Sequence, residues 1–337
     1  MPSHPVRPLD GTADAEFSDI RGLWAHTQHI DMGDLTRARP TSRRIGAHSM
    51  TPTLVRHHRY ADSSAPVDAG TRARDWAEIQ ERMLAPLYEA VYERLEVGAA
   101  TRMLSLDCGS GLALLIAASR GARVTGVDTD RERLALARER LAPDPGQDAG
   151  PGRTGPRARL VDRIPAVAPD GEGPYNLLTA FQPIGCAAGD SEGLAPALAS
   201  AVPLAVRGAT VVLAGWGPPE RCATAPVLRV AARLSESARA PRSGSGWRPT
   251  LRDDLEEVAA RAGLKPDGSG RVSCPFGYAD VDSAVRGLLS TGLFDTAIRA
   301  TDRTQVEKEV AEALHPHLRP DGTVWMPNVF RYLVCVT

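Results

Sequence analysis

The chain has 337 residues, a formal net charge of −1 at pH 7 and a hydrophobic content of 42%. A chain of this length holds one large domain or two smaller ones, and its apolar content is sufficient for a packed core. The near-neutral charge argues against a nucleic-acid-binding protein, which needs a basic surface. No apolar run is long enough to cross a membrane, and the N-terminus lacks the apolar core of a secretion signal. The five cysteines are scattered without a Cys-x-x-Cys pair, a pattern typical of reduced thiols in a cytoplasmic protein.

Residues 1–70 differ in composition from the rest of the chain. They are rich in Pro, Arg, His, Ser and Thr, and they hold six of the eight histidines. No cysteine or carboxylate falls at metal-ligand spacing among these histidines, and residues 71–337 show no such spacing either, so no metal site is expected. We interpret residues 1–70 as an N-terminal extension that is flexible or wraps over the surface, and 71–337 as the main domain.

A long helix is predicted over residues 72–97. The apolar positions Trp76, Ile79, Met83 and Leu87 recur at helical spacing. Pro86 lies inside this pattern and predicts a division of the helix in two.

The most informative stretch runs from Met103 to Asp128. An apolar run, 103–106, is followed by Asp107-Cys108-Gly109-Ser110-Gly111, a helical run over 112–119 and a second apolar run over 124–127 that ends on Asp128. This order predicts a strand, a glycine loop, a helix and a second strand that carries an acid at its tip. A glycine loop at a helix N-terminus suits an anionic group, and an acid at that tip suits two ribose hydroxyls. The stretch therefore predicts a site for an adenosine-type ligand.

The remaining elements continue the alternation of strands and helices. We expect helices over 131–141, 194–206, 227–238, 251–262 (capped by Thr250), 281–289 and 304–314, and strands from 160 and over 175–181, 209–214, 272–276 and 329–336. Such alternation predicts a largely parallel sheet covered on both faces. Because ligands bind at the carboxyl ends of parallel strands, Asp107, Asp128, Asp162 and Gln182 should converge on one edge of the sheet.

Residues 76–337 resemble the class I S-adenosylmethionine-dependent methyltransferases. The resemblance is to the branch that includes ubiquinone and menaquinone methyltransferases and many tailoring enzymes of actinomycete natural-product pathways. The stretches that carry it are 75–80, 108–112, 126–128, 216–220, 274–276 and 330–334. It implies an α/β fold with a Rossmann-like, doubly wound sheet of seven strands, the last antiparallel. It also implies a helical lid, for which we expect residues 72–97, 217–250 and 276–325.

The resemblance further implies S-adenosylmethionine as cofactor. Asp128 would bind the ribose, Asp162 would lie near the adenine amino group, and the 109–111 loop would lie beside the methionine tail. The expected cofactor-binding residues are Trp76, Asp107, Gly109, Gly111, Asp128, Thr129, Asp162, Arg163 and Phe181. A small-molecule substrate is expected against Gln182, Trp216, Trp247 and Tyr278. The candidate catalytic groups are Asp107 and His315, although His315-Pro316-His317 fits a polar turn equally well.

Two residues depart from the glycine motif of the family, which reads acid-x-Gly-x-Gly-x-Gly. With Cys108-Gly109-Ser110-Gly111 in register, Ser105 replaces the acid and Asp107 replaces the first glycine. An aspartate there brings a negative charge to the methionine end of the cofactor, where it would repel a carboxylate or hold an ammonium. A shifted register would instead make Asp107 the motif acid.

Three functions compete on these grounds. The first is methyl transfer from S-adenosylmethionine to an aromatic or polyketide-type natural-product acceptor. The second is an enzyme of the same fold that works without this donor and catalyses coupling, addition or cyclisation of a biosynthetic intermediate. The third is a non-catalytic ligand-binding protein. A serine hydrolase and a nicotinamide-dependent dehydrogenase fit less well, because the glycine spacing matches neither motif.

Overall fold

A computed structural model describes residues 68–142, 158–167, 173–186, 190–237 and 253–337. The chain divides into two units, 1–61 and 62–337. All the described residues belong to the second unit, so the extension expected over residues 1–70 lies almost wholly outside them. Trp247 and Thr250 also lie outside the described residues.

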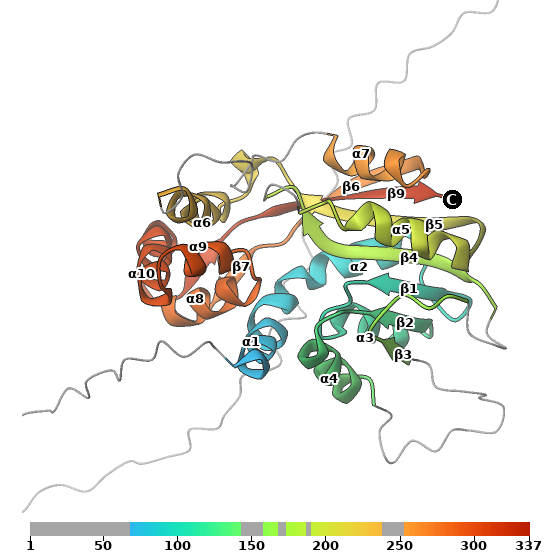
Figure 1. Ribbon diagram of the computed structural model, residues 1–337, viewed down its shortest axis with the longest axis horizontal. Coiled ribbons are helices and arrows are strands. Elements are labelled where there is room, and N and C mark those ends of the chain that lie inside the picture. The colour runs from blue at the N-terminus through green and yellow to red at the C-terminus, as the bar shows by residue number, and fades with distance from the viewer. Residues whose placement is uncertain (1–67, 143–157, 168–172, 187–189, 238–252) are drawn as a thin grey trace, which may run out of the picture. The chain divides into compact units, whose positions relative to one another are not determined.

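The second unit combines one large mixed sheet with helices and a separate two-stranded ribbon (Figure 1). The strands are β1 Arg102–Leu106, β2 Arg123–Val127, β3 Ala158–Val161, β4 Tyr175–Ile184, β5 Ala205–Trp216, β6 Lys265–Ser273, β7 Phe276–Tyr278, β8 Val324–Met326 and β9 Val329–Val336. The α-helices are α1 Ala69–Asp75, α2 Ala85–Arg94, α3 Leu112–Ser119, α4 Arg131–Arg140, α5 Leu194–Ala201, α6 Ala225–Ser237, α7 Asp254–Arg261, α8 Val281–Ser290, α9 Asp295–Ala300 and α10 Arg303–Leu314. Short irregular helices are η1 Trp76–Gln80, η2 Glu81–Leu84, η3 Val202–Leu204, η4 Pro219–Arg221 and η5 His315–His317.

The large sheet has the strand order β3-β2-β1-β4-β5-β9-β6. Strands β1 to β5 are parallel, whereas β9 runs antiparallel between β5 and β6. The expected seven-stranded sheet with an antiparallel final strand is therefore confirmed. Because β1, β2 and β4 are parallel neighbours, their carboxyl ends share one edge, as the sequence predicted for Asp107, Asp128 and Gln182.

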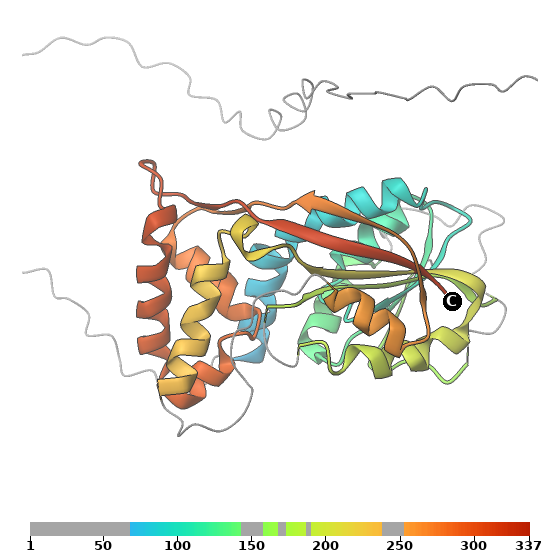
Figure 2. The same ribbon diagram turned by 90° about the horizontal axis from the view of Figure 1, so that it is seen from above.

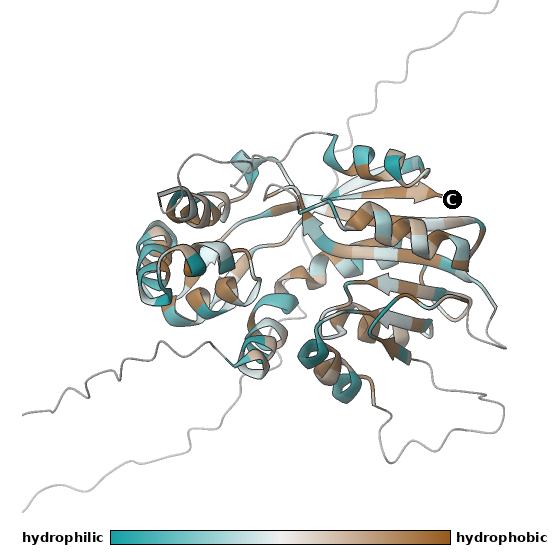
Figure 3. Ribbon diagram, viewed as in Figure 1, coloured by the Kyte–Doolittle hydropathy of each residue, from teal (hydrophilic) through white to brown (hydrophobic). Residues whose placement is uncertain are grey.

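Two apolar cores cover the two faces of the sheet. Helices α2, α3 and α4 pack on one face, in a core that continues into α6, α8 and α10, and α5 and α7 pack on the other. Figure 2 shows α2 and α7 on opposite sides of the strands. Hydrophobic colour follows the central strands in Figure 3, whereas α4 is largely hydrophilic because only its inner face, with Leu134 and Ala137, is buried.

Two elements differ from the sequence prediction. The strand predicted over 272–276 is divided between two strands in the structure. Strand β6 begins earlier, at Lys265, and ends at Ser273, and β7 begins at Phe276 after Cys274 and Pro275. The run from Lys265 to Gly270 looks like a loop in sequence because it contains Pro and Gly. It is an edge strand with a register shift between Pro266 and Gly268, a place where sheets tolerate these residues.

The second difference is the helix predicted over 72–97. It is interrupted by a π-helical turn, η1, and a 3₁₀ turn, η2, before α2 begins. Pro86 lies in the first turn of α2, so the division occurs before it. The helix predicted to begin at Leu251 starts at Asp254, as α7. Asp280 caps α8, since its carboxylate accepts from the Ser283 N–H at 2.6 Å.

Candidate functional site at the carboxyl ends of strands β1 and β2

The glycine loop follows β1 and leads into α3 through three left-handed residues. Asp107, Gly109 and Gly111 have φ angles of 49°, 58° and 82°. Glycine adopts this conformation freely, whereas among other residues Asp and Asn tolerate it best. Asp107 thus has a left-handed backbone, which a glycine at this position would adopt without strain.

Asp128 closes the other side of this loop from the tip of β2. One of its carboxylate oxygens accepts from the Gly109 N–H at 2.8 Å, and the other accepts from the Asp130 N–H at 2.8 Å. The residue is 6% exposed. Burial raises its pKa, although the two backbone donors and Arg133 oppose the shift. Each oxygen keeps a second lone pair, so the carboxylate can still accept hydroxyl groups from a ligand.

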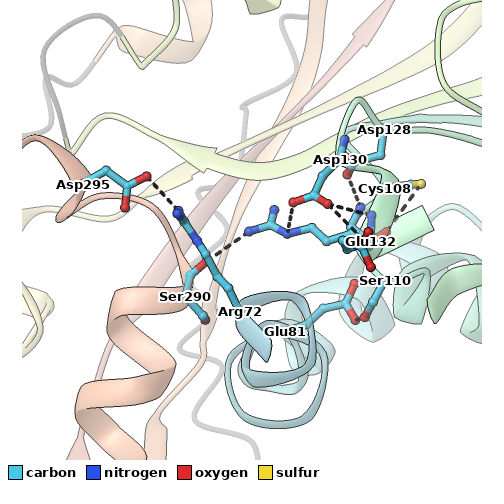
Figure 4. A network of polar contacts seen from close by, with 11 residues as sticks. Arg72, Glu81, Cys108, Ser110, Asp128, Asp130, Glu132, Ser290 and Asp295 are labelled. Atoms are coloured by element: carbon cyan, nitrogen blue, oxygen red, sulfur yellow. Dashed lines mark hydrogen bonds and ion pairs between the residues drawn. The ribbon is translucent and has the colours of Figure 1, made fainter. Parts of the chain in front are cut away.

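Glu81 holds the N-terminus of α3 from the opposite side (Figure 4). Its carboxylate accepts from the Ser110 hydroxyl and from Arg140 Nη1 at 2.6 Å, and its second oxygen accepts from the Leu112 N–H at 3.4 Å. The side chain of Glu81 is only 2% exposed. A helix N-terminus favours an anionic group, and in this protein that group is the chain's own carboxylate.

Trp76 covers the same loop and lies beside Arg133 of α4. The Arg133 guanidinium stacks over the indole ring at 4.4 Å from its centroid, and its Nη2 donates to the Ser290 carbonyl at 3.1 Å. Trp76 is 4% exposed, and its Nε1 has no hydrogen-bond partner among the described residues. This N–H points at the glycine loop, because a Cβ built on Gly109 would lie 2.9 Å from Nε1. A buried donor without a partner is costly.

Asp107 directly follows β1 at the start of the glycine loop. Its side chain is exposed, yet burial by the surrounding chain is the main cause of its raised pKa, and Asp128 is the second. The neighbouring Cys108 thiol also has a raised pKa, through burial and then through the charges of Asp128, Glu81 and Asp107. The loop is therefore surrounded by three carboxylates.

The other polar residues predicted for the site lie at its rim. Thr129, Asp162 and Arg163 are exposed, and Gln182 is partly buried. Arg163 Nε donates to Asp162 at 3.3 Å, which lowers the pKa of this carboxyl. They share the sheet edge with Asp128, and their roles toward a ligand remain predictions.

Two predicted aromatic residues lie in the core. Phe181 is 4% exposed and packs against Tyr88 and Tyr92 at centroid distances of 5.0 and 5.7 Å. Tyr278 is buried and donates its hydroxyl to Gln80 Oε1 at 2.9 Å. Both therefore support the helices that cover the site, and any contact of theirs with a ligand remains a prediction.

Trp216 lines a cavity of about 870 Å³ at the end of β5. Its ring packs against Phe330 at 4.7 Å between centroids. The cavity is also lined by the 217–221 loop and by Arg271 and Arg331. His315 is exposed in η5, at the end of α10. This placement agrees with the polar turn, and no described contact joins His315 to Asp107.

Sequence reasoning missed Glu81 and its partner Arg140. In a regular α-helix, Glu81 would lie about 140° around the axis from Trp76 and would point away from it. The π-helical turn η1, with its wider i to i+5 spacing, brings both residues to the glycine loop. Glu78 and Arg82 flank Glu81 in the same stretch, so no local signal distinguished it.

Among the described residues, no helix has the length and apolar character that a membrane span requires. No group of three or more His, Cys, Asp or Glu side chains that could hold a metal ion occurs in this part of the chain.

No protein-family model matches the chain, and no curated protein matches it. Solved structures of similar fold include YcgJ from Bacillus subtilis, with 12% identity and a TM-score of 0.43 over 74% of this chain and 97% of that one. A methyltransferase from Thiobacillus denitrificans, solved with S-adenosylhomocysteine, has 17% identity and a TM-score of 0.39 over 75% and 91%. The (4+2)-cyclase SpnF has 15% identity and a TM-score of 0.39 over 73% and 79%.

The strand order decides the fold class. The fold is that of the class I methyltransferases. The order β3-β2-β1-β4-β5-β9-β6, with β9 antiparallel, matches the sheet that the sequence resemblance implied. In open α/β sheets ligands bind outside the carboxyl ends of the strands, the edge at which Asp107 and Asp128 lie.

Proposed function

We propose that this protein is an enzyme of the methyltransferase fold that binds an adenosine-type nucleoside at the glycine loop and acts on a small organic molecule. The observation that carries the proposal is that Asp128 and the unpartnered Trp76 N–H both lie against Gly109. Asp128 offers free lone pairs to two ribose hydroxyls, and Trp76 offers a buried donor to a ring nitrogen or an oxygen. The cavity beside Trp216 has the volume of a small-molecule site and is the candidate acceptor pocket.

S-adenosylmethionine is the proposed cofactor of the first candidate function, methyl transfer. The nucleoside half fits the residues present, and Asp107 suits the positive charge of the ammonium. The carboxylate of the methionine half does not fit, because Glu81 already occupies the N-terminus of α3. To bind there, this carboxylate would have to displace Glu81 from Arg140 and Ser110.

The same misfit favours a second candidate, an enzyme of this fold that does not use S-adenosylmethionine as donor. Glu81 and Asp107 together make the methionine end negatively charged. Such an enzyme would catalyse coupling, addition or cyclisation of a biosynthetic intermediate at the same site.

Isothermal titration calorimetry of the full chain tests the nucleoside site. The titrants are 5′-methylthioadenosine, S-adenosylhomocysteine and S-adenosylmethionine, and the variants are Asp128→Asn and the matched control Glu139→Gln, an exposed acid on α4. We expect Asp128→Asn to weaken the binding of every nucleoside about 10- to 100-fold, because charge-assisted hydrogen bonds are lost. Equal binding by both variants, or no nucleoside binding by the wild type, would refute the site.

The Asp107→Gly variant separates the two candidate functions. Binding of S-adenosylmethionine by the wild type favours methyl transfer. Binding that appears only in Asp107→Gly favours the donor-independent enzyme, because the negative charge at that position then closes the donor site.

A further inference from the structure

The carboxylate of Glu81 affects which nucleoside the site accepts. This inference rests on the nucleoside site proposed above. Glu81 is anchored by three groups at once, the Ser110 hydroxyl, the Leu112 N–H and the Arg140 guanidinium. Figure 4 shows Glu81 and Ser110 side by side at the start of α3. One anion-binding N–H group of this helix, that of Leu112, is thus already bonded to a carboxylate of the chain itself.

Little space remains beside the loop for a second carboxylate. A Cβ built on Gly109 would lie 2.9 Å from a Glu81 oxygen and 2.9 Å from Trp76 Nε1. These two side chains therefore lie directly against the loop at the point where glycine gives closest approach to the backbone.

The charges around the loop disfavour an anion as well. Burial raises the pKa of the Cys108 thiol, and the carboxylates of Asp128, Glu81 and Asp107 raise it further. Two arginines lie nearby. Arg140 binds Glu81, while Arg133 stacks on Trp76 and donates to Ser290, and its Nε has no hydrogen-bond partner among the described residues. A ligand carboxylate would therefore meet three carboxylates against two arginines, one of which is already paired with Glu81.

One buried group points to a ligand independently of these acids. Trp76 is more than nine-tenths buried, and its Nε1 is directed at the loop without a partner among the described residues. Being neutral, this donor suits a nucleoside nitrogen or oxygen and provides no counter-charge for an anion. The exposed Asp107 carboxylate is then the group available to contact the tail of the ligand.

From this arrangement we infer that the site selects an adenosine-type ligand whose 5′ tail is positively charged and carries no carboxylate. Glu81 takes the place of the missing carboxylate, and Asp107 pairs with the cationic tail. Glu81 is then the residue that determines tail specificity, and Asp107 is the one that contacts the tail.

Calorimetry with two ligands that differ by one carboxylate tests this inference. The titrants are S-adenosylmethionine and its decarboxylated form, and neutral 5′-methylthioadenosine reports on the nucleoside site alone. We expect the full chain to bind the decarboxylated ligand at least about tenfold more tightly than S-adenosylmethionine, the effect of one added like charge near Glu81. The neutral nucleoside should bind with an affinity between the two.

Variants assign the preference to particular residues. Glu81→Gln keeps the shape of the side chain but removes its charge, and it should reduce the difference in affinity between the two ligands to about threefold or less. Asp107→Asn should weaken binding of the decarboxylated ligand about tenfold and change the affinity for 5′-methylthioadenosine little. Glu78→Gln, an exposed acid on the same segment, is the control and should leave the preference unchanged.

The outcomes separate this inference from the nucleoside site on which it rests. If the wild type binds S-adenosylmethionine as tightly as the decarboxylated form, the inference is overturned while the nucleoside site stands. If none of the three ligands binds, both fall together. If Glu81→Gln fails to fold, the comparison of the two ligands on the wild type still decides the matter.

Discussion

Replacing Arg140 with methionine is the sharpest perturbation of the site, because it removes one partner of a buried ion pair and leaves the other. Glu81 is 2% exposed and Arg140 is 24% exposed. Removing one partner of a buried pair costs about 3–5 kcal/mol, since the remaining charge stays desolvated. Because Arg140 is partly accessible, we expect a loss near the lower end, about 3 kcal/mol.

Equilibrium unfolding in urea, followed by tryptophan fluorescence, measures this loss. The midpoint should fall while the slope of the free energy of unfolding against urea stays constant, since the surface exposed on unfolding is unchanged. For a domain of this size the melting temperature should fall by about 6–12 °C. Arg138→Met, which removes an exposed arginine from the same helix, is the matched control and should change the free energy of unfolding by less than about 0.5 kcal/mol.

A double-mutant cycle tests the cause of the loss. Glu81→Gln alone should cost about 1–2 kcal/mol, because Arg140 retains some access to solvent. The double variant should be less destabilised than the sum of the single variants by at least about 1 kcal/mol, since no uncompensated charge is left. Equal losses in Arg140→Met and Arg138→Met, or additive losses in the double variant, would refute the assigned role of the pair.

Two further outcomes follow from the raised pKa values. For Asp107, the raised pKa means that the folded state holds the proton more tightly than the unfolded state, so wild-type stability falls as the pH rises above the unfolded value. Asp107→Asn should therefore be more stable than the wild type at pH 7, by less than about 1 kcal/mol after solvent screening. This difference in stability should disappear as the pH falls toward about 4. Thermal melts in which the difference does not change with pH would contradict this. All five cysteines are buried, and burial raises the pKa of the thiols of Cys274 and Cys335 to about 12 and about 11. An aromatic disulfide reagent at pH 8 should titrate none of the thiols in the native chain and all five after denaturation, and rapid reaction of a native thiol would show that this packing is wrong.

The sequence by itself determined the fold class, because its signals are local. Glycines at fixed spacing, apolar runs of strand length and an acid at a strand tip each act through neighbours in the chain, and together they specify the β1–α3–β2 unit. That Asp107 stands in the place of a glycine is what the resemblance to the family motif implied, in one of its two registers. The left-handed backbone at Asp107 agrees with it.

Only the tertiary structure decided what fills the space beside the glycine loop. Glu81 and Gly109 are far apart in sequence, and no local pattern indicates that a carboxylate on one segment will occupy the helix N-terminus of another. The π-helical turn η1 directs Glu81 toward the glycine loop, whereas a regular helix would direct it away. Arg140 of α4 then forms an ion pair with Glu81. Long-range packing and charge pairing, which local spacing does not encode, therefore determine the chemical character of the site.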